Sequence, residues 1–462
     1  MLPLLTPEEL DRFRIEYGED AIAELEQVVE DCSPANNKVI FAGHRGCGKS
    51  TLLAEFSRRL EMAEDEKYFV VFFSIADLIE MSDVNHITIL FAIAVQLVEK
   101  NINRRINIKP STQEALERWF ANRTRIEIKT PVKADVSAGF DLFGIIKGKL
   151  KTDSTIREEI KQTFTHNLPD LMDQIDEIAA IIQVTTHLDI LVIIDDLDKL
   201  GLAQVCNIYQ EHVKALFQPK FRLIFTIPIA LLREMPLRSR LETETNTQIK
   251  FLRAAKLFAT GANRDPAVAA NAAPLDTFQQ ILDKRLSPDL IDPDTARQIA
   301  FNSGGVLREL IRIANECCSH CLLRLRRKTP PDQLIINPKI LDTALNRLRN
   351  DFATPLNRIH DQILSTLYEK FLPNNTSQTE EQKFLDLLHG PYSLEYRNCE
   401  IWYDVGPWSL NCSTVRARNQ FVVSPSVLPD SRIRATSFST NQRRPRSQQT
   451  RVGLKPRLRT CL

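Results

Sequence analysis

The chain has 462 residues, enough for about two to four domains, and its 43% hydrophobic and 26% charged content is ordinary for a globular protein. Its formal net charge of +1 hides two opposite parts, because residues 1–405 carry a charge of −9 and the stretch from Gly406 onward carries +10. The N-terminus lacks the features of a signal peptide, no apolar run could span a bilayer, and nine scattered Cys favour reduced thiols, so we expect a cytoplasmic protein rather than a secreted or membrane-spanning one.

Residues 1–36 predict a helical linker ahead of the first strand. A capping-box pattern begins the first helix and consists of Thr6, Pro7 and Glu9. A second helical pattern covers 21–32, and a turn-rich stretch then leads into a short apolar strand.

Strand and helix patterns alternate from 37 to 258. The expected strands lie at 38–42, 68–75, 188–196, 221–229 and 247–252. Apolar residues recur at helical spacing between them, at 49–63, 86–100 and 203–217. Apolar strands of this kind are buried on both faces, and their alternation with helices predicts an α/β fold with a doubly wound parallel sheet.

A long insertion, at about 101–170, interrupts this alternation. Residues 101–151 hold eleven basic and five acidic side chains, and 123–140 alternates as a β-hairpin would. The stretch 154–183 predicts an amphipathic helix broken near Pro169. The basic hairpin is either a solvated insertion or a contact for nucleic acid or a protein partner.

The C-terminal half predicts three further parts. A helical lid is expected at 273–327, after a small-residue linker. Three helices and a two-stranded hairpin, with a turn at Asn398, give 333–405 the sequence shape of a winged helix. The tail at 406–462 is rich in Arg, Ser and Pro and is expected to be disordered; it either binds nucleic acid or has no function.

A cysteine cluster lies in the last helical pattern of the lid. Its residues are Cys317, Cys318, His320 and Cys321. Structural zinc usually takes four ligands from paired motifs, and no second pair is near, so buried thiols on a helix are favoured over a metal site.

The segment "FAGHRGCGKST" matches a phosphate-binding loop, Gly-x4-Gly-Lys-Ser. Glycines at 43, 46 and 48 let backbone N–H groups turn toward an anion, and the next helix adds its positive N-terminus. Lys49 would reach the phosphates, and the Ser50 hydroxyl would complete a Mg²⁺ shell. The expected nucleotide-binding residues are Gly43, His44, Arg45, Gly46, Cys47, Gly48, Lys49, Ser50 and Thr51.

A second motif, "LVIIDDLDKL", places acids at the end of a buried strand. Asp195 would hold Mg²⁺, and Asp196 would orient and polarise the attacking water as a general base. Asp198 fits the role of a helix cap or turn residue. The alternative for the adjacent pair is also a cap or turn, but the phosphate loop favours the catalytic interpretation.

Two further residues are candidates for contact with the γ-phosphate. Thr226 ends the strand after the acidic motif, where its hydroxyl either senses the phosphate or makes a strand-end hydrogen bond. Arg308 lies at a glycine-broken helix start, where it either reaches back to the phosphate or lies on the surface. No [NT]KxD guanine-reading box follows the acidic strand, so adenine is the expected base.

The motifs "GHRGCGKST", "LVIIDDLD" and "SGGVLREL", followed by the winged-helix pattern, resemble the AAA+/STAND class of P-loop ATPases over about residues 10–405. The nearest shapes are origin-recognition-like AAA+ ATPases and STAND switch proteins, and the doubled acid is more typical of STAND and KAP-type ATPases. The resemblance implies a sheet of order 5-1-4-3-2, a helical lid, a C-terminal winged-helix-like domain and ATP-dependent switching. It places the magnesium role on Ser50 and Asp195, the catalytic base on Asp196 and the lid sensor on Arg308.

The chain departs from these families in two places. The long insertion replaces a short AAA+ connection and lacks the membrane helices that KAP proteins carry. No convincing arginine finger precedes the strand at 221–229, and the candidates are Arg222, Arg233 and Arg238. Ring assembly is therefore not predicted, although an oligomer on ATP binding stays open.

Three functions follow from these patterns. The first is an ATP-hydrolysing, Mg²⁺-dependent switch that acts on an unidentified protein partner through the lid, the insertion and the winged helix. The second is an ATP-dependent protein that binds duplex DNA. The third is a degenerate scaffold that binds nucleotide without hydrolysis.

Overall fold

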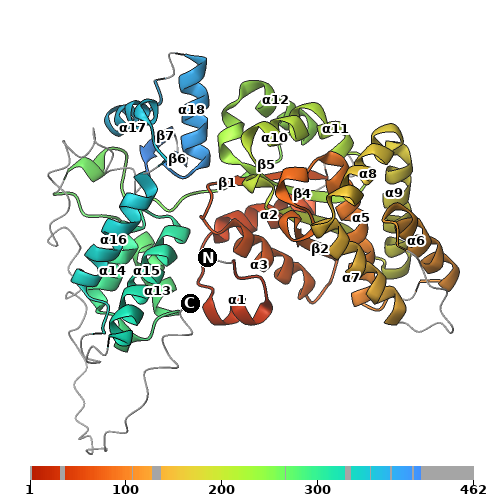
Figure 1. Ribbon diagram of the computed structural model, residues 1–462, viewed down its shortest axis with the longest axis horizontal. Coiled ribbons are helices and arrows are strands. Elements are labelled where there is room, and N and C mark those ends of the chain that lie inside the picture. Colours follow the sequence, from red (N-terminus) through yellow and green to blue (C-terminus); the bar gives the residue numbers. More distant parts are fainter. Residues whose placement is uncertain are drawn as a thin grey trace, which may run out of the picture.

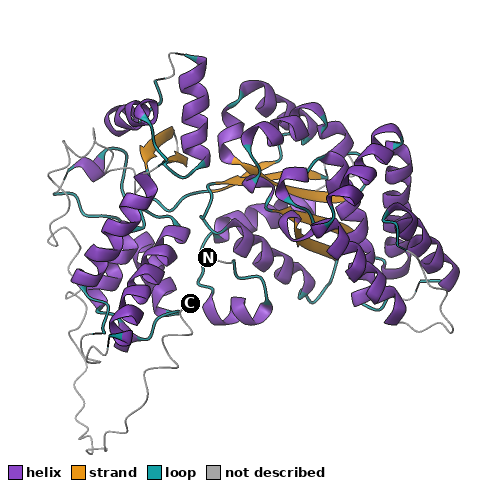
Figure 2. Ribbon diagram, in the orientation of Figure 1, coloured by secondary structure: helices purple, strands orange, loops and turns teal. Residues whose placement is uncertain are grey.

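A computed structural model describes residues 3–406 except 32–36, 107, 127–136, 266, 328–333, 354, 375–376 and 398–399. Its centre is a parallel five-stranded sheet (Figures 1 and 2). The strands are β1 (Lys38–Gly43), β2 (Tyr68–Ser74), β3 (Asp189–Asp195), β4 (Arg222–Pro228) and β5 (Ile249–Leu252). Their order is β2-β3-β4-β1-β5, which from the other edge is the expected 5-1-4-3-2. The predicted α/β class and sheet are confirmed.

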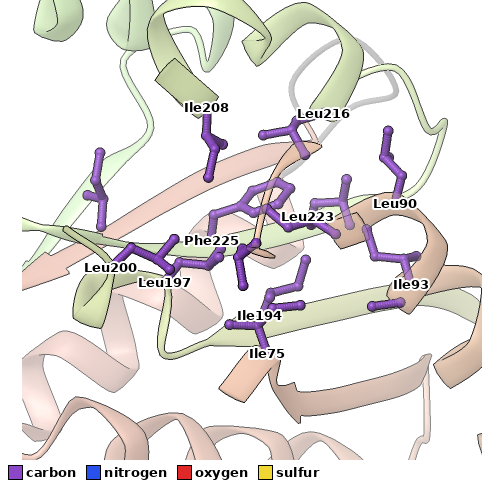
Figure 3. Close-up of a cluster of buried hydrophobic side chains, with 14 of the residues drawn as sticks. Ile75, Leu90, Ile93, Ile194, Leu197, Leu200, Ile208, Leu216, Leu223 and Phe225 are labelled. Carbon is purple, nitrogen blue, oxygen red and sulfur yellow. The ribbon is translucent and has the colours of Figure 1, made fainter. Parts of the chain in front are cut away.

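Helices cover both faces of the sheet, because nearly every strand side chain is buried. On one face, strand residues such as Phe41 and Ile193 pack against α2 (Glu19–Asp31) and α3 (Lys49–Glu61). On the other, Ile194 and Phe225 pack against Leu90 and Ile93 of α5 (His86–Asn103), as Figure 3 shows. This two-sided burial explains the continuous apolar strand runs. The first helix, α1 (Pro7–Phe13), begins with the predicted capping box.

The connections between the core strands add shorter elements. Short α4 (Ile75–Leu78) follows β2, and α12 (Met235–Glu244) precedes β5. The helix expected at 203–217 is interrupted, because α10 (Leu202–Cys206) and α11 (Val213–Leu216) flank a π-helical turn at Asn207–Glu211. Apolar periodicity predicts the helix but cannot show the extra residue that a π turn accommodates.

The described part of the insertion is mainly helical. Its helices are α6 (Pro110–Arg123), α7 (Ser137–Thr152), α8 (Ser154–His166) and α9 (Leu168–Thr186). The hairpin expected at 123–140 is wrong for its described ends, because Arg123 ends α6 and 137–140 begin α7; residues 127–136 lie outside the described part. The break near Pro169 is confirmed, because α9 begins at Leu168. Burial of the apolar face of α7 against α5 outweighs the alternating pattern.

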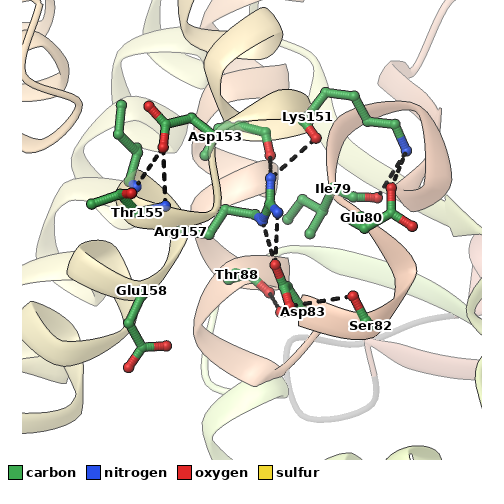
Figure 4. A network of polar contacts seen from close by, with 12 residues as sticks. Ile79, Glu80, Ser82, Asp83, Thr88, Lys151, Asp153, Thr155, Arg157 and Glu158 are labelled. Carbon is green, nitrogen blue, oxygen red and sulfur yellow. Dashed lines mark hydrogen bonds and ion pairs between the residues drawn. The ribbon is translucent and has the colours of Figure 1, made fainter.

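Ion pairs bind the insertion to the core. The buried Arg157 of α8 contacts Asp83 through Nε and a terminal nitrogen, at 2.8 and 2.7 Å, and donates to the carbonyl of Leu150 (Figure 4). Lys147 of α7 lies 2.9 Å from Glu99 of α5. Within the insertion itself, Arg123 of α6 lies 2.8 Å from Asp170 of α9. These three bases are therefore paired within the chain rather than offered to a polyanion.

The lid forms a second hydrophobic cluster beside the sheet, at the end of the molecule opposite the insertion (Figure 1). Its helices are α13 (Ala272–Asp283), α14 (Pro293–Asn302) and α15 (Leu307–Arg326). Cys317, Cys318 and Cys321 are buried in this cluster. Among the described residues, the one group of potential metal ligands consists of Asp195, Asp196 and Asp198 and does not include these cysteines.

Three helices and an antiparallel hairpin follow the lid. They are α16 (Pro338–Ala353), α17 (Arg358–Lys370), α18 (Gln378–His389), β6 (Ser393–Arg397) and β7 (Ile401–Val405). The buried side chains of α16 belong to the lid cluster, whereas those of α17, α18 and the hairpin join the cluster of the sheet. The expected turn at Asn398 and the tail from 407 lie outside the described part. Among the described helices, none has the length and apolarity needed to cross a membrane.

Candidate nucleotide-binding site

The predicted phosphate loop runs from the end of β1 to the start of α3. Gly46 and Gly48 have φ values of 86° and 96°, which glycine adopts without strain. A Cβ at Gly46 would lie 2.5 Å from Cβ of Arg308, so a side chain there would also collide with the lid. A Cβ at Gly43 would lie 2.9 Å from the carbonyl oxygen of Leu252 in β5. Glycine at these positions therefore serves both the turn and the packing around it.

Lys49 is the first residue of α3 and is almost fully buried. Its ammonium donates to the carbonyls of Gly43 and His44, both at 2.9 Å. It also forms an ion pair with Oδ2 of Asp198, at 2.8 Å. The lysine thus lies inside the loop, where the phosphate-binding motif places it.

Asp195 ends β3 beside the loop, and its geometry fits a divalent cation. The carboxylate is buried, the nearby Ser50 hydroxyl favours its charged form, and Oδ1 has no hydrogen-bond partner among the described residues. One carboxylate oxygen from each of Asp195, Asp196 and Asp198 lies within 4.8 Å of the others. Burial, followed by the charges of Asp196 and Asp198, raises the pKa of Asp195. Hard oxygen donors of this kind suit Mg²⁺.

Asp196 has the left-handed backbone that a strand-end turn requires, with φ of 69°. Its Oδ2 accepts from the Ser74 hydroxyl at 2.8 Å, and Nζ of Lys199 lies 2.5 Å from Oδ1. Ser74 ends β2, the neighbour of β3 in the sheet. The carboxylate is therefore positioned by two strands at the edge where the phosphate loop lies.

Asp198 and Arg45 contribute more to the site than the sequence indicated. Asp198 is buried against Lys49 rather than acting only as a turn residue. Burial opposes ionisation of Asp198, but Lys49, Arg45 and Lys199 together lower the pKa of its carboxyl. Arg45 donates to the carbonyls of Asp198 and Lys199. The sequence shows that Asp198 follows Asp195 by three residues. Only the folded chain shows that its carboxylate contacts Lys49.

The lid contacts the phosphate loop through the start of α15. The Arg308 backbone N–H donates to the carbonyl of Gly46 at 2.9 Å, and its side chain lies against the same glycine. A cavity of about 30 Å³ lies next to this contact and is lined by Tyr17, Thr51, Leu52, Ile281 and Leu307 among others. The buried Tyr17 hydroxyl has no hydrogen-bond partner among the described residues. N-terminal segment, loop and lid thus meet at one point.

Thr226 is buried in β4, and both hydrogen bonds of its hydroxyl are internal. It accepts from the Leu197 N–H at 3.1 Å and donates to the Ile194 carbonyl at 3.3 Å. This is the strand-end arrangement that the sequence analysis gave as the alternative to a phosphate sensor. Its placement orients the backbone that follows Asp196.

The C-terminal hairpin reaches the phosphate loop, which no sequence pattern indicated. The Glu395 N–H of β6 donates to Nε2 of His44 at 2.7 Å, and both residues are buried. His389, at the end of α18, lies close to the backbone of Leu200 after the acidic turn. Burial lowers the pKa of His44 and of His389 to about 4. His44 and Glu395 are 351 residues apart, so no local sequence pattern could have indicated their contact.

The arginine-finger candidates all have partners within the chain. Arg222 pairs with Asp189 and Arg238 with Glu242, at 2.8 Å each. Arg233 lies 5.0 Å from the ring centre of Tyr403.

A larger cavity, of about 750 Å³, lies at the insertion rather than at the phosphate loop, and its charged lining is balanced between three acids and three bases. Neither the three arginines nor this cavity provides a second candidate for the nucleotide site.

The sheet order, loop and acidic strand define a P-loop NTPase, a class that binds and hydrolyses nucleoside triphosphates. Residues 19–227 match the model of the KAP family P-loop domain, so this part of the chain is similar to that family. The match spans the phosphate loop, the insertion and both strands β3 and β4. A search of curated proteins finds no match.

Several solved structures are similar over most of their length. The Walker-type ATPase PABY2304 of Pyrococcus abyssi shows 14% identity, covers 88% of this chain and 97% of its own, and has a TM-score of 0.42. Cdc6p of Pyrobaculum aerophilum shows 11% identity, with 90% and 96% covered and a TM-score of 0.37. A RuvB variant of Thermotoga maritima shows 14% identity, with 91% and 99% covered and a TM-score of 0.37. Likeness of this size assigns no activity to the chain.

Proposed function

We propose that the protein is a Mg²⁺-dependent ATPase that acts as a STAND-type switch. The observation that carries the proposal is the meeting of Lys49, Ser50, Asp195 and Asp196 at one edge of the sheet. Lys49 and the loop N–H groups bind the β- and γ-phosphates. Ser50 and Asp195 hold the magnesium ion, which would neutralise charge that develops on the phosphates.

Asp196 is the proposed general base. The Ser74 hydroxyl and the turn at the end of β3 fix its carboxylate, so it can orient a water molecule for attack. Arg308 of the lid, which lies against Gly46, reports the γ-phosphate to the lid. Thr226 supports the same region by holding Leu197 in place.

The base of the nucleotide is proposed to enter between the lid and the N-terminal segment. The cavity there, lined by Thr51, Tyr17 and Leu307, is apolar apart from a few polar groups, as nucleobase sites commonly are. Its volume of about 30 Å³ has room for about one water molecule. A base can enter only if α15 or the segment before α2 moves, so nucleotide binding and lid position are linked.

The switch is proposed to act through the C-terminal helices and hairpin, α16 to β7, as a winged-helix-like domain. His44 belongs to the phosphate loop and accepts from the backbone of β6, so a change in the loop is felt directly by the hairpin. An unidentified protein partner would bind the surface released in one nucleotide state.

A pair of substitutions tests the ATPase assignment. We expect Lys49→Ala to lose Mg²⁺-dependent phosphate release, because the loop then lacks its phosphate-binding charge. We expect Asp196→Asn to bind ATP while losing hydrolysis by about 100-fold or more, because the general base is absent. Arg312→Ala, a half-exposed arginine one turn further along α15, serves as the control. Hydrolysis by Lys49→Ala at the parental rate contradicts the assignment.

Duplex DNA binding is the second candidate, because the C-terminal elements have the order of a winged helix. The charge of α18 weighs against it, since Glu380, Glu381 and Asp386 outnumber Lys383 on this helix. Binding of duplex DNA by residues 1–405, weakening steeply with salt, would support it. Binding that requires the residues after 405 would assign the contact to the basic tail.

A further inference from the structure

Lys49 already has all the hydrogen-bond partners that an ammonium can use. Its three donors go to the carbonyls of Gly43 and His44 and to Oδ2 of Asp198, at 2.9, 2.9 and 2.8 Å. The lysine is 5% exposed, so no donor faces solvent. A phosphate group can therefore bind Lys49 only by replacing one of these three acceptors.

The carboxylate is the acceptor that a phosphate can replace with least change. The two carbonyls belong to the loop that wraps the phosphates, whereas Asp198 comes from the separate turn after β3. It is also the one anion among the three partners, and phosphate supplies the same charge to the lysine. The ion pair is buried on both sides, with side chains 4% and 6% exposed.

Asp198 has other cations within reach once it leaves Lys49. Arg45 already holds the carbonyls of Asp198 and Lys199, and both Arg45 and Lys199 act electrostatically on the Asp198 carboxylate. Lys199 now contacts Oδ1 of Asp196, at 2.5 Å. A shift of Lys199 toward the released Asp198 would take a cation away from the proposed general base.

We propose that Asp198 is a gating residue of the nucleotide site: it occupies Lys49 until the triphosphate displaces it, and its release frees Asp196 from Lys199. This inference rests on the proposed function, because it describes how that site loads. It assigns a task to the third acid of "DDLD" beyond a turn residue. The gate weakens phosphate binding relative to a loop without it, because the ion pair between Lys49 and Asp198 must break first.

The test compares two single-charge removals from the same acidic cluster. ATP affinity is measured by titration calorimetry in EDTA, so that metal binding by the acids does not contribute. We expect Asp198→Asn to bind ATP about tenfold more tightly than the parental chain, because the competing ion pair is gone. Asp196→Asn removes the same charge without touching Lys49, and we expect its affinity to change by less than about threefold.

A stability measurement without nucleotide provides a second readout. Asp198→Asn leaves Lys49 buried without its anion, so urea unfolding should occur at lower concentration, and the double variant with Lys49→Met should recover most of the loss. If Asp198→Asn does not fold alone, folding of the double variant still supports the ion pair.

The outcomes separate this inference from the proposed function. If neither the parental chain nor Asp198→Asn binds ATP, with or without magnesium, the proposed function and the gate both fail. If the parental chain binds ATP and Asp198→Asn binds no better than Asp196→Asn, the gate alone is wrong. A double variant as unstable as Asp198→Asn also overturns it.

Discussion

Cys47 belongs to the phosphate-loop motif in sequence, but its side chain lies in the hydrophobic core. It lies between two glycines of the phosphate loop, yet its thiol is fully buried in the cluster that includes Phe41 and Leu53. Burial raises the pKa of this thiol to about 11, against the opposing influence of Lys49 and Arg308. This position thus belongs to the phosphate-loop motif in sequence, while its side chain belongs to the core.

We therefore expect Cys47 to resist alkylation in the native protein. At pH 7.5 a thiol with a pKa of about 11 is almost entirely protonated, and the thiolate is the reactive form. Peptide-level mass spectrometry after iodoacetamide treatment should find Cys47 unmodified in buffer and modified in urea. Native modification of Cys47 at the rate of a free thiol would show that the loop opens more than its packing indicates.

Among the elements, those with strong local signals were predicted and those set by distant contacts were not. The strands, the phosphate loop and the acids after β3 follow from apolar runs, glycine spacing and adjacent carboxylates. The end of α6 and the start of α7 were expected to form a hairpin at 123–140. The alternating pattern of this basic stretch suggested strands and did not reveal the apolar face of α7. The pairing of Asp198 with Lys49 and the contact of His44 with β6 depend on the folded chain.

The contact between the phosphate loop and β6 gives a prediction for these two elements. We expect His44→Leu to leave the Glu395 N–H buried without an acceptor, at a cost of about 1–3 kcal/mol in the free energy of unfolding. Hydrogen exchange of the Glu395 amide should accelerate with it. His166→Leu, at the exposed end of α8, should change neither quantity. Unchanged exchange in His44→Leu would mean that the hairpin is held without the loop.

In the whole molecule, the C-terminal hairpin, the lid and the sheet all contact the candidate phosphate loop. Side chains of α17, α18 and β7 belong to the same hydrophobic cluster as the sheet. The lid adds the contact between Arg308 and Gly46. Three parts that lie far apart in the sequence thus pack together around the loop.

This shared packing makes the stability of the molecule depend on pH through neutral histidines. Burial lowers the pKa of His44, His86 and His389 to about 4, from an ordinary value of about 6.5. Because unfolded histidines bind more protons between these values, the contribution of the three histidines to stability is complete above about pH 6.5 and is lost as pH decreases toward 4. The raised pKa of Asp195 acts in the opposite direction.

We expect the three histidines to lower the urea concentration needed for unfolding at pH 5 relative to pH 7.5, against the opposite contribution of Asp195. Fully buried His44 contributes as much as about 3 kcal/mol over the whole interval, and the partly exposed His86 and His389 contribute less. In His44→Leu the dependence should be shallower, because one of the three groups no longer titrates, whereas His166→Leu should keep the parental slope. A parental slope in His44→Leu would show that this histidine is not held neutral by the contact between the loop and the hairpin.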